Sequence, residues 1–229
     1  MSVATLGYGD LPALLGRLTG DEKHSPSAHS TLDVLWVLYD RVLRVSPASA
    51  DDPARDRFLL SKGHGPMAYY AVLAAKGFIP VDELDRFGDF DSRLGYHPDH
   101  VLIPGVEISS GSLGHGLGLG VGMVLGLRAL GLTQPRVVVL VGDAELDEAS
   151  NHEAIHFAGA RGLGALTAVV IDNHSSSYPL ERGLGGLFEV AGWDVREVSG
   201  RDHAALQSAL TATSRRRPSC VVAAVEPAR

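Results

Sequence analysis

Hydrophobic positions along the chain change their spacing several times, and each spacing predicts a different element. Residues 30–45 carry apolar side chains at helical spacing, with Ser30 or Thr31 able to cap the first turn. Small and aromatic residues over 67–78 predict a second helix, which ends at a glycine and a proline. Between about 82 and 108 the chain is polar and rich in loop-forming residues, so we expect irregular structure there.

Two later segments, 136–143 and 166–173, are continuously apolar, which is typical of strands covered on both faces. The intervening residues 150–161 predict a helix, and Ser150 and Glu153 have the spacing of a capping box at its start. A strand, a helix and a second strand in this order predict two parallel strands with both carboxyl ends at one edge of the sheet.

Further apolar patterns over 187–198 and 218–225 continue this alternation. No linker, internal repeat or low-complexity tract divides the chain. The expected fold is therefore α/β, with a mostly parallel sheet and helices on both faces, in a single domain over residues 1–229. Residues 1–30 are expected to form an N-terminal arm of that domain.

Composition narrows the classes of partner. Hydrophobic residues make up 45% of the chain and charged residues 21%, which is ordinary for a globular domain. The formal net charge of −7 argues against a nucleic-acid partner, because phosphate backbones bind basic surfaces. No apolar run reaches the roughly 18 residues of a membrane span, and no secretory signal is evident. The single cysteine, Cys220, lies in a predicted buried strand and fits a reducing compartment, so we expect a cytoplasmic protein.

The segment 152–156 reads H-E-x-x-H, a spacing that places two imidazoles on one helix face around zinc. A zinc hydrolase would use His152 and His156 as ligands and Glu153 as the base. Nothing downstream matches the longer zinc-protease signatures, and ten histidines make a chance match easy. An ordinary helix face is the alternative interpretation.

Asp143 and Asn173 suggest a different site. Each ends one of the two predicted strands, thirty residues apart, and ligands of open α/β sheets bind outside those carboxyl ends. A carboxylate and an amide oxygen suit Mg²⁺ or Ca²⁺ shared with a diphosphate. The alternative is that both residues only provide turn chemistry after their strands.

The order G-D-x-E, then H-E, then D-N resembles the thiamine-diphosphate motif of transketolases. Other segments are similar to further motifs of that family, in the family's order: "HSPSAHSTLDVL", "RFLLSKGHGP", "YHPD", "PGVEISSGSLGHGLGLGVGM" and "FEVAGWDVREVSGRD". The resemblance covers about residues 20–225. It implies a thiamine-diphosphate-binding domain with Mg²⁺ or Ca²⁺ as its metal.

The resemblance also implies roles for single residues. Asp143, Asn173 and a backbone carbonyl at Ser175 would ligate the metal. The residues implied to lie along the cofactor are His64, Gly111, Leu113, Gly142, Asp143, Ala144 and Asn173. The resemblance implies that the substrate channel is lined by His24, His64 and His97, which would also carry protons. Histidine suits proton transfer because its unperturbed pKa lies near the working pH. Glu148 matches an acidic position that couples paired sites.

In that family the H-E pair belongs to the helix behind the metal loop. His152 and Glu153 would therefore be structural, and His156 coincidental. The glycines of 114–122 alternate regularly, which favours close packing of a helix against a partner over a cofactor fingerprint. Two departures stand out: Ala144 replaces the last glycine of G-D-G, and His174 and Ser175 follow Asn173 where the family has Asn-Gly or Gly-Ile.

After "VVAAVEPAR" the family continues to a pyrimidine-binding domain, which has no counterpart in these 229 residues. We therefore expect the amino-terminal subunit of a split transketolase-like enzyme that transfers a two-carbon ketol or acyl unit from a ketose or keto acid. Its partner would be a C-terminal subunit carrying the pyrimidine-binding domain, and self-association is expected as well. The alternative is a catalytically silent scaffold or regulatory subunit with a degenerate cofactor site.

Overall fold

The computed structural model describes residues 6–20, 25–63, 66–177 and 180–226. Its centre is one parallel sheet in which the strands follow the order β1-β2-β3-β5-β4. The strands are β1 (Arg57–Leu60), β2 (Val137–Gly142), β3 (Leu166–Asp172), β4 (Asp194–Ser199) and β5 (Ser219–Ala224). We call the side of the sheet where these strands end the carboxyl edge, and the side where they begin the amino edge.

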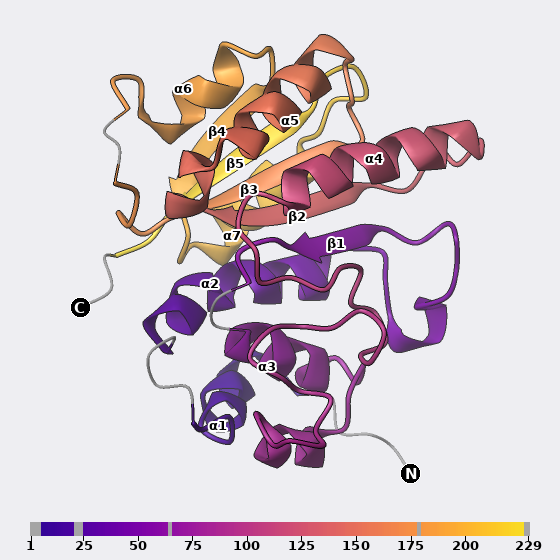
Figure 1. Cartoon of the computed structure of the whole chain (residues 1–229), viewed down its shortest axis with the longest axis vertical. Coiled ribbons are helices and arrows are strands. Elements are labelled where there is room, and N and C mark those ends of the chain that lie inside the picture. Colours follow the sequence, from indigo (N-terminus) through magenta and orange to yellow (C-terminus); the bar gives the residue numbers. More distant parts are fainter. Residues whose placement is uncertain (1–5, 21–24, 64–65, 178–179, 227–229) are drawn as a thin grey trace.

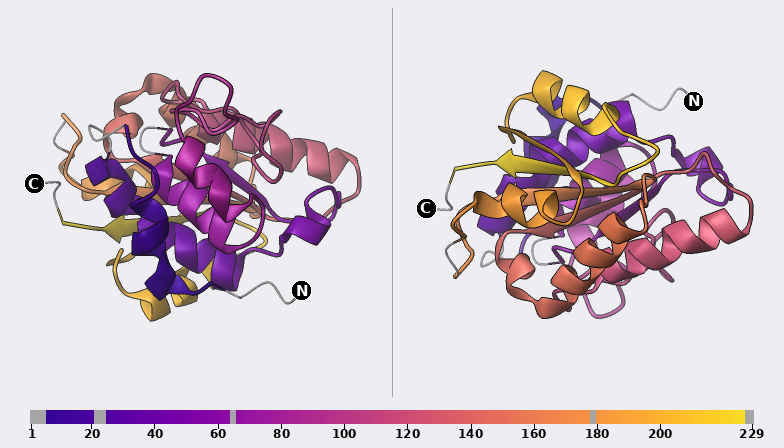
Figure 2. Two further views of the ribbon diagram at one scale, coloured as in Figure 1. Left: turned by 90° about the horizontal axis from the view of Figure 1, so that it is seen from below. Right: turned by 90° about the horizontal axis from the view of Figure 1, so that it is seen from above.

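Helices cover both faces of the sheet, as Figures 1 and 2 show. One side carries α1 (Leu11–Leu15), α2 (Ser25–Val37), α3 (Met67–Ala75) and α7 (His203–Thr211). The other carries α4 (Gly116–Ala129), α5 (Ala149–Ala160) and α6 (Gly183–Glu189). Short helical turns are η1 (Tyr8–Asp10), η3 (Leu38–Val42), η4 (Pro47–Ser49), η5 (Val81–Arg86) and η6 (Ala144–Asp147). The expected α/β class, with a parallel sheet and helices on both faces, is confirmed.

Alternate residues of β2 belong to the two halves of the core. Val138 and Leu140 pack with the side of α2 and α3, whereas Val137, Val139 and Val141 pack with the side of α4 and α5. All five side chains are almost fully buried. Burying each of these side chains stabilises the folded state by roughly 1.5–3 kcal/mol, so β2 is firmly anchored in the core. The loop that follows β2 therefore starts from a fixed position.

The helix expected over 30–45 begins earlier and ends differently. It starts as α2 at Ser25 and passes into the π-helical turn η3. The predicted cap at Ser30 or Thr31 is wrong, because both lie inside the helix and donate hydrogen bonds back to carbonyls of the preceding turn. The predicted N-terminal arm contributes to the core as well, since Leu11, Leu14 and Leu18 are buried.

The capping box predicted at Ser150 and Glu153 is also wrong. Helix α5 begins at Ala149, so Ser150 is already in its first turn. Its hydroxyl donates instead to Gly114 O at 2.8 Å and ties α5 to the loop before α4. The segment 187–198 divides between the end of α6 and strand β4, and 82–108 is irregular apart from part of η5.

The alternating glycines of α4 face two directions. A side chain at Gly120 would come within 2.7 Å of Val139 Cγ2, so this glycine lets the helix lie close to the sheet. Gly118 and Gly122 face open space. None of the described helices combines the length and the apolar character needed to cross a membrane.

Candidate functional site

Asp143, Asn173 and Ser175 come together at the carboxyl edge. Asp143 directly follows β2, and Asn173 directly follows β3, the neighbouring strand. The Ser175 hydroxyl contacts Asp143 Oδ1 and lies 2.8 Å from Asn173 Oδ1. Three oxygen atoms from the two strand ends therefore converge, as the sequence led us to expect for Asp143 and Asn173.

The Asp143 carboxylate accepts most of the hydrogen bonds in this cluster. It is 1% exposed and accepts N–H groups from Ala144 at 2.8 Å, Ser175 at 2.6 Å and Ser176 at 3.2 Å. Hydrogen bonds to a charged group contribute about 1.5–3 kcal/mol each, so the contacts from Ser175 and Ser176 tie the loop after β3 firmly to the end of β2. Asp147 adds a second tie, because it accepts the Ser176 hydroxyl at 2.9 Å.

His174 gives this loop its direction. Its φ of 58° places it in the left-handed region, and it is the one non-glycine residue with positive φ among the described residues. Histidine tolerates that conformation better than branched residues do. The Asp172 carboxylate accepts the His174 backbone N–H at 3.3 Å, and the turn that results directs Ser175 back toward Asp143.

Glu145 joins the Gly-rich loop to the end of β2. Its side chain is buried and accepts Gly114 N at 3.0 Å, Gly142 N at 3.3 Å and the Ser61 hydroxyl. Burial raises the pKa of the Glu145 carboxyl, and the hydrogen bond from Ser61 offsets part of that rise. One side chain thus holds three segments that are distant in sequence.

Lys62 lies against the same loop. A side chain at Gly142 would come within 3.2 Å of Lys62 Cδ, so the lysine stem covers this glycine. Its ammonium donates a hydrogen bond to the Ser27 hydroxyl. Burial lowers the pKa of Lys62 to about 8, although Asp143 and Glu145 act in the opposite direction.

The Gly-rich loop and the segment of His97 meet beside these residues. Gly111 has a φ of 141°, and a side chain there would come within 3.0 Å of His97 Cδ2. A side chain at Gly63 would in turn come within 2.7 Å of Gly111 N. Glycine is therefore required at 111 by both conformation and space. Leu113 is half-buried in the same loop. His24 and His64, the other two expected channel histidines, lie outside the described residues.

A small cavity of about 200 Å³ opens next to Asp143. Its lining includes Asp147 and His152 together with three leucines in α6 or just before it, namely Leu180, Leu184 and Leu187. The cavity therefore combines two carboxylates with an apolar wall at the carboxyl edge.

The H-E-x-x-H segment does not form a metal site in the described part of the chain, where three or more His, Cys, Asp or Glu side chains nowhere gather around a common point. His152 Nε2 instead lies 2.9 Å from Leu146 O and fastens α5 to η6. His156 is exposed.

Sequence reasoning assigned no role to Lys62, Glu145 or Ser61, although each lies in a segment quoted for its motif. The signal was present, because an acidic and a basic residue next to continuously apolar strands are unusual unless they are paired. What the sequence did not show was their partners, which come from separate loops.

The chain is similar to several known proteins. The model of the family described as "Transketolase, thiamine diphosphate binding domain" matches residues 20–225. A protein named "Ferredoxin fas2" from Rhodococcoides fascians is 55% identical over 95% of this chain and 72% of its own. A subunit of an apulose-4-phosphate transketolase from Phocaeicola vulgatus is 36% identical over 75% of this chain and 62% of its own. "6-deoxy-6-sulfo-D-fructose transketolase subunit SqwG" from a Clostridium species is 35% identical over 84% of this chain and 72% of its own.

Solved structures give the same fold. Transketolase from Leishmania mexicana superposes with a TM-score of 0.78 at 24% identity, over 96% of this chain and 37% of that one. Transketolase from Pichia stipitis in complex with sedoheptulose-7-phosphate gives a TM-score of 0.80, over 95% of this chain and 36% of that one. This chain therefore corresponds to little more than a third of those proteins.

Proposed function

The chain belongs to the transketolase family, and on that premise we propose that it holds thiamine diphosphate and a divalent cation at the carboxyl edge of its sheet. In this role it is the cofactor-binding component of a transketolase-like enzyme that transfers a two-carbon ketol or acyl unit. The match of the family's thiamine-diphosphate-binding domain to residues 20–225 supports the cofactor.

The convergence of Asp143, Asn173 and Ser175 is the observation that carries the proposal. The Ser175 hydroxyl has a single proton, yet two acceptor oxygens lie within hydrogen-bonding distance of it. A divalent cation satisfies several oxygen ligands at once, and Mg²⁺ and Ca²⁺ prefer this kind of donor. The donor set therefore fits the metal that the family implies.

The roles of the chain's own residues follow from their positions. Asp143 and Asn173 would supply metal ligands, with the Ser175 carbonyl as the third. The backbone of Gly142 and Ala144 would lie close to the diphosphate. Thiamine diphosphate supplies the carbanion-stabilising chemistry that the protein lacks. His97, which lies against Gly111 at the Gly-rich loop, would exchange protons with the substrate.

A second polypeptide completes the proposal. The relatives from Phocaeicola vulgatus and Clostridium, at 35–36% identity, are both named as single subunits of transketolases, which supports a two-component assembly. The partner would be a C-terminal subunit carrying the pyrimidine-binding domain, and self-association is part of the same proposal. The substrate would be a ketose or keto acid, and the compartment the cytoplasm.

Calorimetry with thiamine diphosphate and Mg²⁺, in the presence of the second subunit, tests the site. We expect binding that requires Mg²⁺ and is lost in Asp143→Asn and in Asn173→Ala. Asp194→Asn is the matched control, because Asp194 is a carboxylate that begins β4 at the amino edge. Binding that survives in Asp143→Asn would remove the proposed site.

The silent-scaffold alternative rests on two specific observations. In the described structure the Ser175 hydroxyl lies between the two expected metal ligands, and Ala144 replaces the family's glycine beside them. If the wild-type protein with its second subunit binds no thiamine diphosphate, the scaffold function replaces the enzymatic one.

A further inference from the structure

A second pocket lies at the amino edge of the sheet, away from Asp143 and Asn173. It has a volume of about 460 Å³ and is formed where α4 ends, where β2 and β3 begin, and where the chain approaches β5. Its volume is in the range of small-molecule sites, which are typically about 300–1,000 Å³. Neither the family resemblance nor the site described above uses this pocket.

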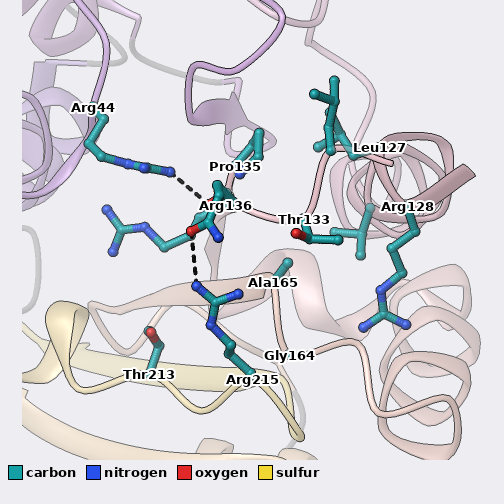
Figure 3. A pocket seen from close by; sticks show the side chains of 13 residues that line it. Arg44, Leu127, Arg128, Thr133, Pro135, Arg136, Gly164, Ala165, Thr213 and Arg215 are labelled. Atoms are coloured by element: carbon teal, nitrogen blue, oxygen red, sulfur yellow. Dashed lines mark hydrogen bonds between the residues drawn. The ribbon is translucent and has the colours of Figure 1, made fainter. Parts of the chain in front are cut away.

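Four of its lining residues are arginines, and Figure 3 draws them with the rest of the lining. The four are Arg44, Arg128, Arg136 and Arg215, and no Asp or Glu lines the pocket among the described residues. The nearby buried Asp56 pairs with Arg44 at 2.8 Å and with Arg136 at 3.0 Å. The pocket therefore keeps an excess of positive charge in a chain whose formal net charge is −7.

The pairs with Asp56 hold two of the arginines rigidly. Asp56 also accepts the backbone N–H groups of Arg44 at 3.0 Å and of Arg136 at 2.9 Å. Arg44 donates in addition to Gln134 O at 2.7 Å. These contacts fix the left-hand wall of the pocket in Figure 3 before any ligand arrives.

The other two arginines keep most of their donors available. Arg128 donates to Gly162 O at 3.0 Å, and Arg215 donates to Gln134 Oε1 at 2.9 Å. A guanidinium group carries five N–H donors, and within the described ranges neither side chain has a second protein acceptor. In Figure 3, Arg128 extends from α4 and Arg215 from the segment before β5, and Thr133 is seen between them.

The remainder of the lining is largely apolar. It includes side chains from α4 and from the segments that lead into β2 and β3, namely Val124, Leu127, Leu132, Pro135 and Ala165. An inorganic anion would leave this surface without a partner. A ligand with both an anionic group and an apolar or carbon-rich body would contact the whole pocket.

We propose that this amino-edge pocket binds a small organic phosphate monoester, with Arg128 and Arg215 donating to its phosphoryl oxygens and the apolar lining contacting its body. Guanidinium groups recognise phosphate through paired N–H donors. A phosphoryl group with a charge near −2 matches several arginines better than a carboxylate does. The proposal is independent of cofactor binding at the other edge.

Titration calorimetry with phenyl phosphate as the probe tests this inference, and inorganic phosphate, phenol and benzoate serve as comparison ligands. We expect phenyl phosphate to bind at least tenfold more tightly than each of the three. Equal affinity for inorganic phosphate would overturn the role of the apolar lining, and equal affinity for benzoate would overturn the preference for phosphate.

Variants locate the binding. The double variant Arg128→Gln, Arg215→Gln should weaken phenyl phosphate binding at least tenfold, and the single Arg128→Gln should weaken it by a smaller factor. Arg217→Gln is the matched control, because Arg217 lies two residues from Arg215, is largely exposed, and does not line the pocket. Circular dichroism of each variant monitors folding. Unchanged binding in a folded double variant, or equal loss in the Arg217 control, would refute the proposal.

Discussion

Replacing Glu145 with glutamine tests the connection between the Gly-rich loop and the end of β2. The wild-type carboxylate accepts Gly114 N at 3.0 Å, Gly142 N at 3.3 Å and the Ser61 hydroxyl. Glutamine has one acceptor oxygen, so one of these buried N–H groups would face the NH₂ group of the amide. A buried donor left without an acceptor costs about 1–3 kcal/mol, and we expect a loss of about 2 kcal/mol in the free energy of unfolding.

The size of this loss depends on pH. Burial raises the pKa of Glu145 above its ordinary value of 4.5 despite the hydrogen bond from Ser61. Folding therefore disfavours the ionised side chain, so its contribution to stability is fully present below the unfolded-state pKa and falls as the pH rises through the native-state pKa. A protonated carboxyl still has acceptor lone pairs on both oxygens, whereas the glutamine NH₂ group has none. Because glutamine does not titrate, the difference between wild type and E145Q should be largest below about pH 4.5 and shrink above it.

Urea unfolding, followed by tryptophan fluorescence at several pH values, measures this difference. Glu148→Gln is the control, because Glu148 is an exposed carboxylate three residues away. If E145Q stays within about 0.5 kcal/mol of E148Q at every pH, the bridging role of Glu145 is wrong. A difference that grows with pH would contradict the direction of the pKa change.

Two further predictions concern the loop after β3 and helix α4. Ser175→Ala should retain Mg²⁺-dependent binding of thiamine diphosphate in calorimetry, because the backbone carbonyl remains; loss of binding would identify the hydroxyl as the ligand instead. Gly120→Ala should lower the free energy of unfolding by about 1–3 kcal/mol, because its Cβ would lie 2.7 Å from Val139 Cγ2. Gly122→Ala, which meets open space, should raise it by about 0.5–1 kcal/mol in the same urea titration. Equal effects of the two glycine substitutions would show that α4 is oriented differently.

The sequence was sufficient for the parallel sheet because its signals are local. Each of β2 and β3 is a continuous apolar run, and the helix between them fixes their relative direction. The same direction places Asp143 and Asn173 at one edge. Their approach could therefore be predicted without knowing any long-range contact.

The sequence was insufficient where a polar side chain has several candidate partners. Ser150 has the spacing of a cap, but its hydroxyl binds Gly114 O from another loop. Ser30 and Thr31 look like caps, but the helix extends beyond them because hydroxyls can also bond within a helix. Glu145 stands out as a charged residue close to an apolar strand, but its three partners come from separate segments that the sequence does not connect.

Strand β2 separates the two pockets by a fixed length. Arg136 precedes it and Asp143 follows it, and its six residues span about 20 Å at roughly 3.3 Å per residue. Pairing with β1 on one side and β3 on the other prevents it from sliding along its own axis. It acts as a rigid spacer that keeps the carboxyl edge and the amino edge of the sheet at a constant separation.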